Sequence, residues 1–149
     1  MNVVISALRP LPEGYPTELV SVGDHIRKRR FDLGLLQREV AEFCGVCEDT
    51  VTGWESGRIP SISIDNWPSV ISFLSYYPFP PPTNLSERLK ALRLCYGFSL
   101  NRLGDELATD VHTLVRYESG VSPKRKSYVG RFCDRLDEYI ESCPPPLYQ

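Results

Sequence analysis

The chain has 149 residues, of which 42% are hydrophobic and 24% are charged, a composition typical of a globular protein rather than a disordered one. It contains no apolar run of about 18 residues, so we expect no transmembrane helix and no membrane partner. The formal net charge of −2 and the pI near 5.7 are more acidic than is usual for a strong nucleic-acid binder.

An N-terminal arm, residues 1–20, precedes the first predicted helix. It opens on a short apolar stretch that lacks the basic flank and the cleavage site of a signal peptide. The five cysteines are an odd number without a disulfide-type framework, and this suits a reducing compartment. We therefore expect a cytoplasmic protein.

The first predicted helix begins after Ser21. Ser21 and Asp24 have the spacing of a capping box, in which each side chain binds a free backbone amide at the helix start. The helix runs to about Leu33, because Gly34 can take the left-handed conformation that closes a helix. Three more helices are expected in this half: one beginning near Leu36, one from Glu48 to Ser56, and one from Pro68 to Tyr76.

A proline-rich segment follows this half of the chain. Four of the five residues from Pro78 to Pro82 are prolines, which excludes a helix and favours an extended polyproline conformation. The C-terminal residues are also rich in proline and are predicted to be unstructured, with a proline-motif docking role as the alternative. The predicted organisation is a first domain at 21–77, a linker at 78–84, a second domain at 85–143 and a tail at 144–149.

The second domain repeats the first at a fixed shift of 63 residues. Without a gap over about 35 residues, this shift aligns Gly34 with Gly97 and Glu55-Ser56-Gly57 with Glu118-Ser119-Gly120. Such colinearity indicates a duplication, and we name the copies by their order in the chain. The helix signals recur in the second copy: an Asn84–Glu87 cap with a helix to about Tyr96, a helix beginning near Ser99, one from Val111 to Ser119, and one over 127–141.

Residues 37–57, QREVAEFCGVCEDTVTGWESG, resemble the helix-turn-helix of the Cro/repressor-type (XRE-like) family. Two helices that cross at a tight turn need a small residue at their contact, a glycine in the turn and an apolar residue under the second helix. These places hold Ala41, Gly45 and Val51 in the first copy and Gly104, Ala108 and Leu114 in the second. The resemblance implies an all-α fold with two tandem small helical domains of the lambda-repressor-like helix-turn-helix type. A left-handed Ala108 would cost about 1 kcal/mol, and we expect it to distort that turn.

The resemblance also implies that the third helix of each copy enters the major groove of DNA, where its early residues contact base edges. The matching residues are Glu48, Asp49, Thr52 and Gly53 in the first copy and Val111, His112, Val115 and Arg116 in the second. Carboxylates can accept from cytosine amino groups but repel phosphates, whereas Arg116 can donate twice to guanine and valines can contact thymine methyl groups. The alternative for all of these residues is a solvated helix face.

In this family, phosphate contacts come from helix N-termini and from the loop after the third helix. The candidates are Gln37, Ser56 and Arg58 in the first copy and Ser119, Lys124, Arg125 and Lys126 in the second. Leu100 stands in the place of Gln37, so that contact is lost in the second copy. Residues 21–60 sum to a charge of −1 and residues 86–126 to +3, which predicts that the second copy binds phosphates better.

Two charged pairs recur at the same spacing, Arg30 with Glu55 and Arg93 with Glu118. In the family this pair joins the first helix to the third, so we interpret both pairs as structural. The Cys44-x-x-Cys47 motif lacks further ligands for a metal, and we interpret Cys44 as a core residue and Cys47 as a helix start. No catalytic triad, paired-acid or phosphate-loop motif is found, so we predict neither an enzyme nor a cofactor.

Together, these observations predict a sequence-specific DNA-binding transcriptional regulator, bacterial or phage-derived by resemblance, whose partner is double-stranded DNA. A second subunit or another protein is a further expected partner, and no small-molecule ligand is predicted. The alternative is a helix-turn-helix module that binds protein, such as an antitoxin-like or mobile-element accessory factor with weak or no DNA binding. The acidic Glu48–Asp49 pair and the low pI favour that alternative.

Overall fold

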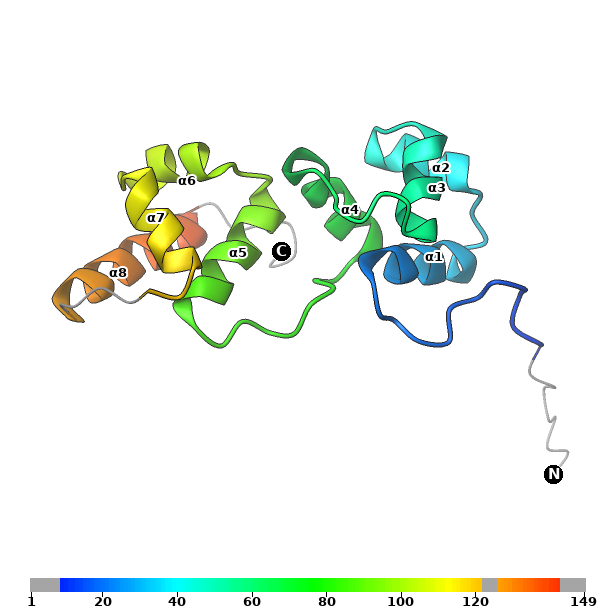
Figure 1. The fold of residues 1–149 in the computed structure, drawn as a ribbon, viewed down its shortest axis with the longest axis horizontal. Helices are drawn as coiled ribbons and strands as arrows, with labels where there is room; N and C mark the ends of the chain where they lie inside the picture. The colour runs from blue at the N-terminus through cyan, green and yellow to red at the C-terminus, as the bar shows by residue number, and fades with distance from the viewer. Residues whose placement is uncertain (1–8, 122–125, 143–149) are drawn as a thin grey trace, which may run out of the picture.

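The computed structural model describes residues 9–121 and 126–142, and within these ranges the chain is all-α, as predicted, with no β-strand (Figure 1). The first half contains α1 (Val22–Asp32), α2 (Gln37–Cys44), α3 (Glu48–Ser56), a 3₁₀ turn (Ile64–Asn66) and α4 (Trp67–Leu74). The second half contains α5 (Leu85–Tyr96), α6 (Leu100–Leu107), α7 (Val111–Glu118) and α8 (Lys126–Ser142). Every predicted helix is present, with ends within two residues of those expected. None of the described helices is long and apolar enough to cross a membrane.

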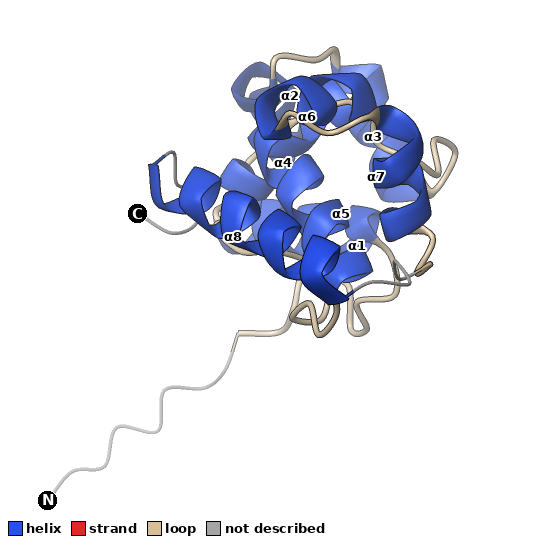
Figure 2. Cartoon of the chain, turned by 90° about the vertical axis from the view of Figure 1, so that its left-hand side faces the viewer, coloured by secondary structure: helices blue, strands red, loops and turns tan. Residues whose placement is uncertain are grey.

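The shift of 63 residues in the sequence is also a repeat of helices. Helices α5, α6 and α7 begin 63 residues after α1, α2 and α3, respectively. Figure 1 shows the two halves side by side along the longest axis, and Figure 2 shows the corresponding helices in similar places when the molecule is seen along that axis. The fourth helices depart from the repeat, because α4 has 8 residues and α8 has 17.

Side-chain caps explain where α1 and α5 begin. The Ser21 hydroxyl accepts from the Asp24 amide at 3.2 Å, and the Asp24 carboxylate accepts from the Ser21 amide at 2.7 Å, which completes the predicted capping box. In the second half, Asn84 accepts from the Glu87 amide at 2.9 Å. The Glu87 carboxylate, however, accepts from the amide of Thr83 at 2.8 Å. The expected cap on α5 is therefore present, with its return bond one residue earlier.

Each half has its own apolar core. In the first half, α1–α4 bury an apolar set: Ile26, Val40, Ala41, Cys44, Val51, Trp54, Val70, Phe73 and Leu74. In the second half, α5–α8 bury the set Leu89, Leu92, Leu103, Leu107, Leu114, Tyr117, Phe132 and Leu136. Three of the four helices in each half belong to the repeated sequence, and the fourth closes the core.

The two halves pack against each other through α4 and α5. Trp67 and Ile71 of α4 form a third buried cluster with Cys95 of α5. A Cβ atom added to Gly97, at the end of α5, would lie 2.8 Å from the Cγ atom of Pro68. The proline-rich segment also folds back, because the Phe79 ring lies 5.6 Å from the Trp67 ring. The proline-rich segment is therefore not the only connection between the halves, which also contact each other directly through α4 and α5.

The Cys44-x-x-Cys47 motif has two different environments. Burial raises the pKa of the Cys44 thiol to about 11, as expected for a packing residue that stays protonated. Cys47 stands at the N-cap of α3 and forms no capping bond to a backbone amide; its sulfur lies 3.0 Å from the Thr50 hydroxyl. Among the described residues, no group of three or more His, Cys, Asp and Glu could hold a metal ion.

Candidate nucleic-acid interface

Helices α3 and α7 each bury one face and expose another. Val51 and Trp54 of α3 are 0% and 4% exposed, and Leu114 and Tyr117 of α7 are 0% and 8% exposed. Apolar packing therefore fixes the rotation of each helix about its own axis. In Figure 2, both helices lie on the same side of the molecule, at its edge. The opposite face of each helix is open to a partner.

A tight turn precedes each of these helices. Gly45 ends α2 in the left-handed conformation, with φ of 70°, and Ala108 ends α6 with φ of 47°. The turns have the same hydrogen bonds, because Val46 donates to Ala41 at 3.0 Å and its counterpart Thr109 donates to Gly104 at 2.9 Å. The predicted left-handed alanine is present, but the expected distortion of its turn is not.

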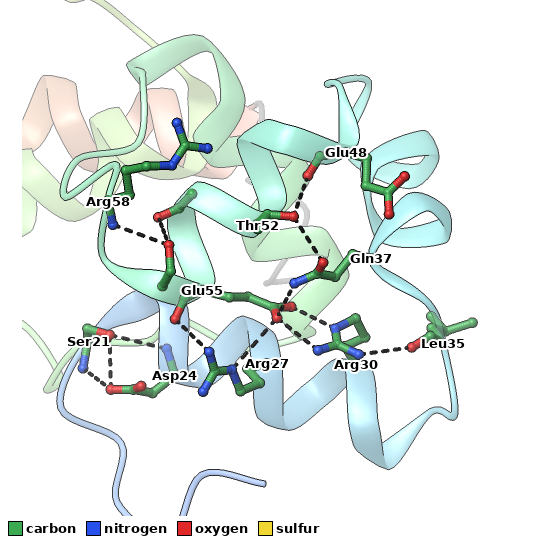
Figure 3. A network of polar contacts seen from close by, with 12 residues as sticks. Ser21, Asp24, Arg27, Arg30, Leu35, Gln37, Glu48, Thr52, Glu55 and Arg58 are labelled. Carbon is green, nitrogen blue, oxygen red and sulfur yellow. Dashed lines mark hydrogen bonds and ion pairs between the residues drawn. The ribbon is translucent and has the colours of Figure 1, made fainter. Parts of the chain in front are cut away.

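A buried carboxylate connects α3 to the surface of the first half (Figure 3). Glu55 is 5% exposed and accepts two hydrogen bonds from Arg30, at 2.7 and 2.8 Å, and one from the Gln37 side-chain amide, at 2.9 Å. The Gln37 carbonyl oxygen accepts from the Thr52 hydroxyl at 2.9 Å. Thr52, a candidate base-reading residue, is thus held in place by Gln37, a candidate phosphate ligand.

Two other candidate residues of the first half bind each other. The Arg58 guanidinium donates to the Asp49 carboxylate at 2.8 Å, and both side chains are exposed, at 56% and 76%. Arg58 also donates to the Asp49 carbonyl oxygen at 3.1 Å. This ion pair offsets one of the two acidic charges at the start of α3 and leaves Glu48 exposed beside it.

The expectation that Gly53 faces outward is wrong. Gly53 is buried, and a Cβ atom at its position would lie 2.5 Å from the Ile59 side chain and 3.3 Å from the Arg58 guanidinium. The loop after α3 folds over this residue, since the Ile59 amide donates to the Gly53 carbonyl oxygen at 2.9 Å. Ser56, by contrast, is exposed, with its hydroxyl 3.4 Å from the Arg58 amide.

Helix α7 presents a different surface. Asp110 caps its start by accepting from the Thr113 amide at 2.9 Å and from the Thr113 hydroxyl at 2.6 Å. His112, Val115 and Arg116 are exposed and Val111 is partly buried, so this group of candidates lies on the outer face. Among the described residues, the Arg116 guanidinium has no hydrogen-bond or ion-pair partner.

Three of the candidate phosphate ligands in the second half fall outside what the structure describes. Lys124 and Arg125 lie outside the described residues, as does the side chain of Lys126 at the start of α8. Ser119 is exposed, and its hydroxyl donates to the Arg116 carbonyl oxygen at 2.8 Å. Its hydroxyl oxygen still has room to accept, and its amide already donates to Val115 at 3.0 Å.

The second ion pair is less enclosed than the first. Arg93 donates to both carboxylate oxygens of Glu118, at 2.8 and 2.9 Å, but their side chains are 20% and 13% exposed. The corresponding values for Arg30 and Glu55 are 12% and 1%. Leu100 replaces the glutamine that joins the first network, so Glu118 lacks that neutral donor.

Sequence reasoning missed Arg135. This residue of α8 donates to the carbonyl oxygens of Leu107 and Ala108, at 3.1 and 3.3 Å, and so caps the end of α6 beneath α7. Arg135 and Arg116 also line one cavity of about 360 Å³ between α7 and α8. No signal in the sequence indicates this contact, because α8 lies beyond the repeated block.

The arrangement can place two outward helices against one extended partner, with donors concentrated on α7 and acceptors on α3. The packed faces of these helices keep their exposed side chains in fixed directions. Searches against models of protein families, curated proteins and solved structures found no match for the chain.

Proposed function

We propose that the chain is a sequence-specific DNA-binding regulator that uses two helix-turn-helix units, with α7 as the stronger base-reading helix. The observation that carries this proposal is the exposed Arg116 guanidinium, which has no partner among the described residues, on a helix that Leu114 and Tyr117 pack against the core. A guanidinium in this situation can donate two parallel hydrogen bonds to a guanine in the major groove. Val115, 46% exposed, can contact a thymine methyl group on the same groove floor.

The first copy supports the same function in a weaker form. Thr52 keeps a hydroxyl near the outer face of α3, and the bond to Gln37 limits its rotation. The Asp49 carboxylate can accept from a cytosine amino group, while its pair with Arg58 reduces repulsion of the phosphates. We infer that this copy adds less affinity than the second and fixes the position of the chain on the duplex.

A second candidate function is a helix-turn-helix module that binds protein. It is favoured by two large apolar side chains of the first half that are exposed, Phe43 at 56% and Leu36 at 54%. Glu48 and Asp49 at the start of α3 would repel phosphates but would attract a basic partner. This candidate predicts that DNA binding is weak or absent.

A salt series separates the two candidates. The chain is titrated with fluorescently labelled duplexes of mixed sequence at low and at moderate salt, and binding is followed by fluorescence anisotropy. DNA binding through phosphates should weaken steeply, with the logarithm of the binding constant falling by about 0.9 per contacted phosphate for each tenfold rise in salt. Absence of binding at low salt would refute the DNA proposal and leave the protein-binding candidate.

Arg116→Ala tests the assignment of α7. It should reduce the ratio of specific to nonspecific binding by about 5- to 150-fold, because one bidentate arginine–guanine pair contributes about 1–3 kcal/mol of discrimination. The matched control is Arg88→Ala, since Arg88 of α5 pairs with Asp137 on α8, away from the outer face of α7. An unchanged ratio in Arg116→Ala would show that α7 does not read bases.

A further inference from the structure

The two outward helices are related by a displacement along the molecule rather than by a two-fold rotation. In Figure 1, α2 and α6 lie at the top of their halves, and α1 and α5 lie below them. In Figure 2, seen along the long axis, α3 and α7 lie on one side, and α6 lies in front of α2. A two-fold rotation between the halves would reverse either the vertical order or the side that carries these helices. The two views show the same vertical order and the same side in both halves, so the halves are not related by a two-fold rotation.

The contact between α4 and α5 fixes this relation. Trp67 and Ile71 are 8% and 2% exposed and pack with Cys95, which is 7% exposed. The end of α5 approaches the start of α4 so closely that only glycine fits at position 97, with Pro68 filling the space a Cβ would need. Phe79 covers Trp67 from the proline-rich segment. The halves are thus joined by side-chain packing as well as by a tether.

The two outer surfaces also differ in chemistry. Helix α3 offers two carboxylates and a hydroxyl, whereas α7 offers an imidazole, an apolar side chain and a guanidinium that has no partner within the described part of the chain. Two surfaces with the same orientation and different chemistry cannot both match the two halves of a palindrome. A palindrome presents the same sequence twice, in opposite orientations.

From this geometry we infer that one chain binds an asymmetric DNA site made of two different half-sites on the same face of one duplex. This inference rests on the proposed function and specifies its substrate. Because the major groove returns to the same face about every 10 base pairs, the half-sites are centred about 10 base pairs apart, or at a multiple of that spacing. A second copy of the chain is not needed to complete the site.

The test begins with selection of sites from random-sequence duplexes by the full chain at low salt. The selected duplex is then compared with a version that has one half-site reversed in place and with a version that has 5 base pairs inserted between the half-sites. Each change should lower affinity by about 100-fold or more, because the second half loses the advantage of being linked to the first. Sedimentation should give one chain per duplex.

Two variants assign the half-sites. Selection with Arg116→Ala should lose base preference in one half-site only, and selection with Thr52→Val, which keeps the side-chain volume, should lose it in the other. A palindromic site with two chains per duplex would overturn the inference. So would a 5-base-pair insertion that leaves affinity unchanged, or a selected site that spans one groove segment. In each of these cases DNA is still bound, whereas failure of the proposed function shows as no binding at low salt.

Discussion

Replacing Arg30 by methionine tests the buried network in the first half. Arg30 gives Glu55 two charge-assisted hydrogen bonds, and the Glu55 side chain is only 1% exposed. Removing one partner of a buried ion pair costs about 3–5 kcal/mol, because the remaining charge has lost its compensation. Glu55 keeps the Gln37 bond and a longer contact to Arg27 at 3.7 Å, so we expect the lower end, about 3 kcal/mol.

Arg93→Met is the matched comparison, because it breaks the equivalent pair in the second half. Glu118 is 13% exposed and can be solvated once Arg93 is removed, so the expected loss is about 1–2 kcal/mol. Urea unfolding is followed by far-UV circular dichroism and by tryptophan fluorescence. Trp54 lies in the core of the first half and Trp67 at its contact with α5, so fluorescence reports on that half and on the contact between the halves. An Arg93→Met loss equal to or larger than that of Arg30→Met would refute the reasoning from burial.

Three further predictions concern the backbone and pH. Gly97→Ala should destabilise the chain by more than Gly34→Ala does. Both glycines are left-handed, but only position 97 lies against Pro68. Equal losses of unfolding free energy in urea would argue against the close contact. Ala108→Gly should raise the free energy of unfolding by up to about 1 kcal/mol in the same assay, because glycine takes positive φ freely. A lower free energy of unfolding in this variant would show that the turn tolerates alanine without cost. Burial lowers the pKa of His25 below its ordinary 6.5, so the unfolded chain binds a proton at a higher pH than the folded chain does. The free energy of unfolding should therefore fall as the pH drops below about 7. Urea titrations at several pH values should show this fall, and His25→Gln should remove it.

Much of the fold follows from signals that act over short stretches of sequence. The caps at Ser21 and Asn84 and the glycines at positions 34 and 97 set helix ends through bonds within a few residues. The repeat shows the same pattern of caps and glycines a second time, 63 residues later in the chain. Such local determinants explain why each helix end that the sequence predicts lies within two residues of the end in the structure.

The candidate site depends on contacts that local signals do not encode. Asp49 and Arg58 are nine residues apart, on a helix and on the loop after it, and their pairing depends on how that loop folds. The same loop places Ile59 over Gly53, which motif matching had assigned to the outer face. The proline run excludes a helix, but it does not indicate that Phe79 packs on Trp67.

The two halves divide stability and binding between them in the proposed function. In the first half, a network of hydrogen bonds joins Arg30 and Gln37 to Glu55 and Thr52 to Gln37, and it limits the freedom of these side chains to turn towards a duplex. In the second half, the glutamine is replaced by Leu100 and Arg116 remains unpartnered among the described residues. The packing of α4 against α5 supports this division, because binding of one half to DNA then holds the other half near the next segment of the groove. An asymmetric site is then the expected consequence of a duplication whose copies kept one scaffold and acquired different surfaces.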